Sequence, residues 1–224
     1  MKKRVLVAWS GGLDSTYLIQ RYLEMGYGVD AVTCNLANAH MSQMKRERAA
    51  MKKMMKGYFK GKDVNLIGTS HIRIEGYCFG ALPLSQVPTW IYNLICYLRE
   101  SHVEVAIGYV MNDDAISFLD TIRGVWNSYQ ELVYSHMTLP PLEFPLTKYK
   151  KTMIWHSLDD ELKKHVTWCE NPAKEDRCGY CPSCKKMLDL GLQTSPVTEP
   201  PSDVKSLTQI EESNLNTADE ETRC

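Results

Sequence analysis

Short apolar runs alternate along the chain with longer stretches in which apolar residues recur at helical spacing. The run Arg4–Trp9 predicts a strand, and Ser15–Met25 predicts a helix with Tyr17 and Leu18 on its apolar face. The same patterns predict further strands at Val29–Cys34, Val64–Gly68, Val103–Gly108 and Leu142–Leu146, and further helices at Met41–Tyr58, Trp90–Glu100 and Ile116–Val133. This alternation predicts an α/β fold with a doubly wound, mostly parallel sheet.

Composition narrows the class of protein. The 224 residues suit one α/β domain over residues 1–165 and a small segment over 166–192. From Gln193 the chain is rich in Ser, Thr, Pro and acidic residues, which predicts a disordered acidic tail over 193–224. A net charge of -1, with no apolar run long enough for a membrane span, predicts a cytoplasmic protein without membrane partners. Oligomeric state stays open, and a homodimer is allowed.

The predicted helix Met41–Tyr58 carries six basic residues. A solvated surface and a nucleic-acid interface both fit such a face. The near-neutral charge of the whole chain favours the solvated surface, so nucleic acid is not an expected partner.

A glycine-rich turn follows the first predicted strand. Its sequence is Ser10-Gly11-Gly12-Leu13-Asp14-Ser15. Two glycines allow main-chain N–H groups to approach a ligand closely, and the following helix presents its positive end, so the turn is a candidate anion site. Ser10 and Ser15 add hydroxyl donors. Asp14 repels a bare phosphate, and its expected work is to accept loop N–H bonds or to meet a Mg²⁺ that rides on phosphates.

Residues far apart in the sequence should meet at this turn. In a doubly wound sheet, ligands bind beyond the carboxyl ends of the strands. The loop Asn35–His40, Asp113 and Lys151 are all expected at that edge. His40 alone is equally compatible with a solvent-exposed loop histidine, and Lys151 with a surface lysine at a helix start.

Four cysteines lie within a short span of the second segment. Cys169, Cys178, Cys181 and Cys184 follow the spacing C-x8-C-x2-C-x2-C. Four thiolates at this spacing favour a closed structural zinc site. An iron–sulfur cluster, a redox dithiol and a nucleic-acid-binding zinc ribbon are the alternatives.

The turn resembles the SGGxDS signature of the ATP pyrophosphatases (PP-loop enzymes). Together with the four-cysteine spacing, it resembles the 7-cyano-7-deazaguanine synthase family of queuosine biosynthesis, over about Lys3 to Leu190. Further matches are His40, Gly108 with Asp113, and Lys151. The resemblance implies an adenine nucleotide alpha hydrolase-like fold. It also implies ATP and Mg²⁺ at Ser10–Ser15, His40, Gly108 and Asp113, catalytic roles for Asp14 and Lys151, and structural Zn²⁺ on the four cysteines.

The implied reaction converts 7-carboxy-7-deazaguanine and ammonia to the nitrile, with release of AMP and pyrophosphate. The chain departs from the family in its acceptor segments. Trp90 and Ile91 replace an Arg-Asn pair, and Asn35 and Ala37 replace an aspartate and a glycine. Adenylation of another deazapurine, a protein carboxylate or a tRNA base is therefore an alternative, and so is a non-catalytic nucleotide- or nucleic-acid-binding protein.

Overall fold

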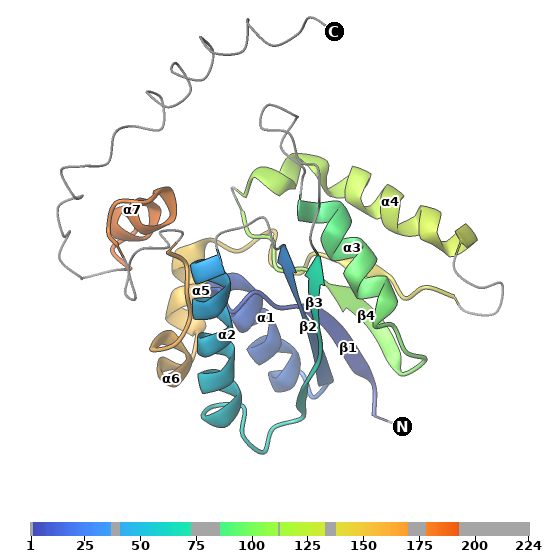
Figure 1. Ribbon diagram of the computed structural model, residues 1–224, viewed down its shortest axis with the longest axis horizontal. Coiled ribbons are helices and arrows are strands. Elements are labelled where there is room, and N and C mark those ends of the chain that lie inside the picture. Colours follow the sequence, from blue (N-terminus) through green and yellow to red (C-terminus); the bar gives the residue numbers. More distant parts are fainter. Residues whose placement is uncertain are drawn as a thin grey trace, which may run out of the picture.

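The computed structural model describes residues 2–36, 41–72, 86–111, 113–132, 138–169 and 178–192. Figure 1 shows a central sheet with helices on both faces. The strands are β1 (Arg4–Ala8), β2 (Gly28–Leu36), β3 (Val64–Ile72), β4 (His102–Ala106) and β5 (Leu142–Glu143). The helices are α1 (Leu13–Glu24), α2 (Met41–Lys56), α3 (Gln86–Cys96), the 3₁₀ helix η1 (Asp114–Phe118), α4 (Leu119–Leu132), α5 (Lys151–Ser157), α6 (Asp160–Lys163) and α7 (Pro182–Asp189).

The strands form one sheet in the order β3-β2-β1-β4-β5, and every neighbouring pair is parallel. The chain therefore starts in the middle of the sheet, builds one half outward through β2 and β3, and crosses back to build the other half. This confirms the predicted α/β class. The β1 and β4 ends lie side by side at the point where the strand order reverses, which is where such sheets bind ligands.

Side chains of β1 alternate between two apolar layers. Val5 and Val7 pack with α1, α2, α5 and α6 on one face, whereas Leu6 and Ala8 pack with α3 and α4 on the other. All four are buried. A strand buried on both faces reads as a continuous apolar run, which is why β1 was readable from the sequence.

Several predicted boundaries were wrong. The second strand extends to Leu36, beyond the predicted end at Cys34, so Asn35 belongs to the strand and not to the loop after it. The third strand extends to Ile72, beyond the predicted end at Gly68, because Thr69–Ile72 pair with the end of β2 although they carry no apolar alternation. The helix predicted from Trp90 begins at Gln86, since Pro88 is tolerated in a first turn. The fifth strand covers only Leu142–Glu143, and it lies at the sheet edge as expected.

Two predictions concern residues outside the described ranges. His40 and the tail 193–224 lie outside the described residues. None of the described helices has the length and apolar character needed to cross a membrane.

A buried carboxylate ties together the amino ends of four strands. Asp30 of β2 has no solvent exposure, and it accepts bonds from Arg4 Nε (2.9 Å) and Nη2 (2.6 Å) of β1. It also accepts from Asn65 Nδ2 of β3 at 2.9 Å. His102 of β4 places Nε2 3.0 Å from Asp30 Oδ2, and its Nδ1 accepts the backbone N–H of Arg99 at 3.0 Å. These two partners define a neutral histidine that donates from Nε2.

The pKa of His102 is lowered because burial disfavours its charged form. The pKa of Asp30 is lowered in spite of burial, because Arg4, Asn65 and His102 all bind its ionised form. A lowered pKa on either group means that the unfolded chain binds the proton more readily than the folded chain. Stability should therefore decline as the pH falls below about 6.5 for His102, and again below about 3.9 for Asp30.

We expect Asp30→Asn to lower the free energy of unfolding by about 3 kcal/mol at pH 7, because it removes the fully buried counter-charge of Arg4 and leaves that guanidinium with the part-exposed Asp63 alone. The variant should also lose part of the decline in stability below pH 4. Urea denaturation between pH 3 and pH 8 measures both effects. The matched control is Asp63→Asn. Asp63 binds the same guanidinium at 2.6 Å but its side chain is 35% exposed, so its removal should cost less than about 1 kcal/mol. Equal losses for the two variants would contradict the account.

Candidate functional site

The turn between β1 and α1 requires glycine at its second position. Gly11 has φ +76°, a left-handed conformation that L side chains rarely adopt. A Cβ at Gly11 would lie 3.1 Å from the carbonyl oxygen of Glu47 and 3.2 Å from Cγ of Met51, both on α2. Glycine therefore satisfies the backbone conformation and lets α2 pack directly against the turn.

The two serines of the turn bond to the turn itself. Ser10 Oγ and Ser15 Oγ are 3.1 Å apart, and the N–H of Gly12 donates to Ser10 Oγ at 3.3 Å. The N–H of Ser10 donates to Ser15 Oγ, also at 3.3 Å. The two hydroxyls therefore stabilise the conformation of the turn. From the sequence they were expected only as donors to a ligand.

The start of α1 leaves backbone donors without acceptors. Gly12 is the N-cap and has no side-chain capping bond, and the first backbone bond into the helix is donated by Thr16 to the Gly12 carbonyl at 3.1 Å. Among the described residues, the N–H groups of Leu13, Asp14 and Ser15 bond to no acceptor. Together with the positive end of the helix, they form an electropositive turn suited to an anion.

Gly108 follows β4 and contacts this helix start. A Cβ there would lie 3.2 Å from the carbonyl carbon of Asp14 and 3.2 Å from the backbone nitrogen of Ser15. The absence of a side chain lets the two strand ends close around the turn. The structure therefore brings Gly108, which the family resemblance had singled out, to the turn.

Lys151, the first residue of α5, forms an ion pair with Asp14. Its Nζ lies 2.9 Å from Asp14 Oδ2, and the two side chains are 21% and 18% exposed. The other oxygen, Asp14 Oδ1, is buried and has no hydrogen-bond partner among the described residues. Burial raises the pKa of Asp14, Lys151 opposes the rise, and the nearby charge of Asp113 adds to it. A buried carboxylate oxygen with no partner among the described residues, in the helix turn that also presents free N–H groups, suits a cation or a hydrogen-bond donor.

Asp113 closes the loop after β4. Its Oδ2 accepts the backbone N–H of Val110 at 2.8 Å, and its charge reaches Asp14 as described above. The structure thus places Asp113 within electrostatic range of Asp14, in a loop-closing role. The participation of these residues in nucleotide binding stays a prediction, and His40 cannot be placed because it lies outside the described residues.

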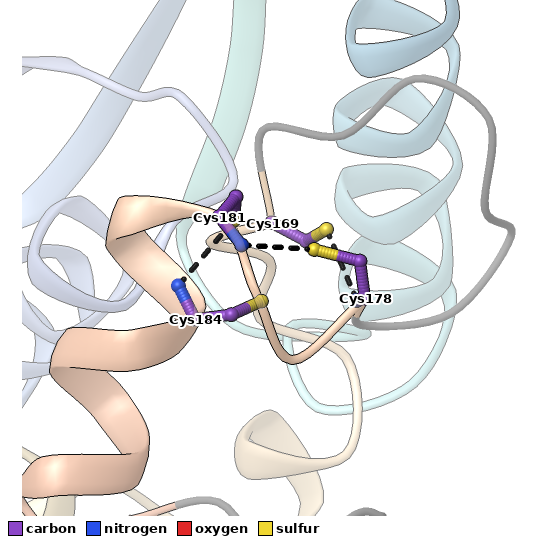
Figure 2. Close-up of side chains that lie close together, drawn as sticks. All are labelled: Cys169, Cys178, Cys181 and Cys184. Carbon is purple, nitrogen blue, oxygen red and sulfur yellow. Dashed lines mark hydrogen bonds between the residues drawn. The ribbon is translucent and has the colours of Figure 1, made fainter. Parts of the chain in front are cut away.

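The four cysteines converge on one buried point (Figure 2). Their sulfur atoms all lie within 4.8 Å of one another. A zinc ion with Zn–S bonds of about 2.3 Å separates its sulfurs by about 3.8 Å at the corners of a tetrahedron, so these four sulfurs lie near enough together to share one metal ion. Zinc, in preference to an iron–sulfur cluster, stays the prediction.

Backbone N–H groups already point at these sulfurs. Cys178 N–H donates to Cys169 Sγ at 3.4 Å, Cys181 N–H to Cys178 Sγ at 3.3 Å, and Cys184 N–H to Cys181 Sγ at 3.4 Å. Burial works against ionisation of Cys178, but the N–H groups of Cys181 and Tyr180 overcome it and lower its pKa to about 7. Burial raises the pKa of Cys184. A metal ion would supply the positive charge that this thiol needs to lose its proton.

Two contributors were missed in the sequence. The backbone of Thr167 pairs with the turn, where its N–H donates to the Gly11 carbonyl at 3.0 Å. Arg46, read as part of a solvated basic face, donates from Nη2 to the Cys169 carbonyl at 2.8 Å. A backbone bond carries no signature of residue type, and one arginine in a basic helix looks like its neighbours, so neither contact had a signal in the sequence.

Comparisons with known proteins identify no family. No protein-family model matches the chain, and no curated protein matches it. Among solved structures, the U34-tRNA thiolase NcsA from Methanococcus maripaludis, with its [4Fe-4S] cluster, is 18% identical with a TM-score of 0.38. The match covers 96% of this chain, which spans 65% of that protein's length. An NMN synthetase from Francisella tularensis is 17% identical, with 97% and 85% of the two chains covered and a TM-score of 0.37. At these values the similarity assigns neither a family nor a substrate.

We expect the purified protein to hold one zinc ion per chain, measured by elemental analysis. Cys184→Ser should abolish the zinc, whereas Cys96→Ser, at an exposed cysteine on α3, should retain it. Removal of zinc by a chelator should lower Tm by about 5 to 10 °C, because a ligand held at about 100 times its Kd contributes about 2.7 kcal/mol. Iron in place of zinc, or full zinc content in Cys184→Ser, would contradict the assignment.

Proposed function

We propose that the protein is an ATP-dependent adenylating enzyme that binds the nucleotide's phosphates at Ser10–Ser15. The observation that carries the proposal is the start of α1. There, free N–H groups of Leu13, Asp14 and Ser15 adjoin a buried, unpartnered carboxylate oxygen and the ammonium of Lys151. Free N–H groups suit phosphate, a lone carboxylate oxygen suits a divalent cation, and a lysine suits negative charge that shifts during transfer.

The groups have separate tasks in this proposal. The N–H groups of α1 bind the outer phosphates and stabilise the charge of the leaving pyrophosphate. Asp14 Oδ1 would hold a Mg²⁺, which when bound neutralises phosphate charge. Lys151 exchanges part of its bond to Asp14 for a bond to the α-phosphate, so that its positive charge acts where the new P–O bond forms. The raised pKa of Asp14 fits this role, since burial opposes its charge and a bound cation would compensate it.

Adenylation explains why a carboxylate would need ATP. Ammonia does not displace oxide from a carboxylate, because oxide is a poor leaving group. Attack of the carboxylate oxygen on the α-phosphorus forms a mixed anhydride with AMP and releases pyrophosphate. Ammonia then displaces AMP to give an amide. A second adenylation at the amide oxygen, followed by loss of AMP and two protons, gives a nitrile. The resemblance noted in the sequence makes 7-carboxy-7-deazaguanine the first candidate acceptor.

One observation favours a second candidate, adenylation of a different acceptor. Ile91 is fully buried in the apolar layer between α3 and the sheet, and Trp90 packs against the same layer. These two residues stand where the resembled family carries an arginine and an asparagine. An apolar pair packed into the core cannot supply the polar contacts of such residues. The turn Ser10–Ser15 is therefore compatible with the adenylation chemistry of the resembled family. The segment expected to bind the acceptor differs from that family at Trp90 and Ile91.

We expect the protein to convert 7-carboxy-7-deazaguanine to the nitrile when ATP, Mg²⁺ and ammonium are supplied, with release of AMP and pyrophosphate. Mass spectrometry of the products measures the conversion. Lys151→Met should reduce kcat about 100-fold, since it removes one charge that stabilises the transition state. The matched control is Lys150→Met, because Lys150 is the exposed neighbour immediately before α5. This control should retain nearly full activity.

The outcomes separate the candidates. Pyrophosphate release that depends on another carboxylate or on a tRNA, with the same sensitivity to Lys151→Met, would support the second candidate. ATP binding without turnover on any acceptor would leave a nucleotide-binding protein. Absence of ATP binding to the zinc-loaded protein would contradict both enzyme proposals.

A further inference from the structure

The phosphate-binding turn is hydrogen-bonded to the segment that enters the four-cysteine site. Thr167 N–H donates to the Gly11 carbonyl at 3.0 Å, and Gly12 and Thr167 form a parallel bridge. The Thr167 carbonyl oxygen also lies 3.4 Å from the position that a Gly12 Cβ would occupy. Thr167 precedes the first cysteine ligand, Cys169, by two residues. A ligand that restrains Cys169 should therefore also restrain Thr167 and, through it, the backbone of Gly11 and Gly12.

Helix α2 contacts both the segment that contains Cys169 and the phosphate-binding turn. Its Arg46 donates from Nη2 to the Cys169 carbonyl at 2.8 Å and from Nη1 to Cys169 Sγ at 3.9 Å. The next residue, Glu47, places its carbonyl oxygen 3.1 Å from the position of a Cβ on Gly11. Adjacent residues of one helix thus contact the cysteine segment and the turn, and the turn is enclosed between α2 and residues 166–168.

The other cysteines join the same unit through α7. Cys181 is the N-cap of α7 and its side chain accepts the N–H of Cys184. From this helix, Met187 is buried in the apolar layer that also contains Leu13 and Tyr17 of α1. Helix α7, which carries Cys184, therefore belongs to the same apolar layer as the helix that starts at the turn.

We propose that Arg46 is a positioning residue that couples metal occupancy of the four-cysteine site to the shape of the phosphate-binding turn. A metal ion held by the four sulfurs fixes Cys169, Arg46 locks Cys169 to α2, and the Thr167 pairing holds Gly11 and Gly12 in the ligand-binding conformation. The inference rests on the proposed function for the identity of the ligand. It goes beyond that proposal in making the metal site a determinant of nucleotide affinity.

Thermodynamic coupling of this kind is reciprocal. If zinc tightens nucleotide binding by a given factor, nucleotide must tighten zinc binding by the same factor. We expect about a 10-fold effect, within the usual range for coupled sites. Arginine is suited to the link because its planar fork reaches the carbonyl and the sulfur together. A lysine at this position carries the charge but presents only one nitrogen.

The experiment uses the full-length protein, zinc-loaded and chelator-stripped. Hydrogen exchange reports on the Gly11–Ser15 amides, and calorimetry measures the Kd for ATP with Mg²⁺. Zinc should slow exchange of these amides and tighten the Kd about 10-fold. Zinc-loaded Arg46→Ala, checked for equal zinc content, should show faster exchange at the turn and a weaker Kd than the zinc-loaded wild type. Arg46→Lys should recover only part of the difference.

The matched control is Arg48→Ala, an equally charged and more exposed residue on the same helix, which should behave as wild type. The proposal is overturned if zinc changes neither loop exchange nor Kd, or if Arg48→Ala weakens the coupling as much as Arg46→Ala. Slower loop exchange with zinc but no ATP binding would refute the proposed function and support the coupling. ATP binding with equal Kd in both metal states would refute the coupling alone.

Discussion

The carboxylate of Asp14 occupies a position in which burial opposes its charge and only one of its oxygens is paired. Lys151 bonds Oδ2, while Oδ1 is buried without a partner among the described residues. Such a group costs the fold free energy, so its presence at a helix start with free N–H groups needs a reason. A phosphate ligand with its cation supplies both missing charges. The glycines of the turn, the ion pair with α5 and the close contact of Gly108 all meet at this one position.

The polar groups that stabilise the sheet and those proposed for chemistry lie at opposite ends of its strands. At the amino ends of the strands, Asp30 is fully buried and satisfied by Arg4, Asn65 and His102. At the carboxyl ends, the turn leaves donors and an acceptor unsatisfied. The same sheet thus carries a closed polar network at one end and an open one at the other. A closed network fixes the strands, which gives the open one a rigid support.

Much of this architecture was readable from the sequence, and the exceptions have physical causes. Strand and helix periodicity located β1 and α1, and the edge rule for parallel sheets brought Asp113 and Lys151 to the turn. Cysteine spacing located the convergent sulfurs. The polar end of β3 was missed because strand pairing, not side-chain burial, holds it in the sheet. The Thr167 pairing was missed because any residue type can form it, and it is the contact that joins the two candidate sites.

The central claim is that the free N–H groups at the start of α1 bind nucleotide phosphates. Titration of ¹⁵N-labelled, zinc-loaded protein with ATP and Mg²⁺ tests it directly by NMR. The account predicts that the largest amide shifts occur at Leu13, Asp14 and Ser15, and that inorganic pyrophosphate reproduces most of them. No shifts at these amides would contradict it. So would shifts confined to the far lining of the cavity of about 730 Å³ between α2 and β3, such as Lys52 and Leu66.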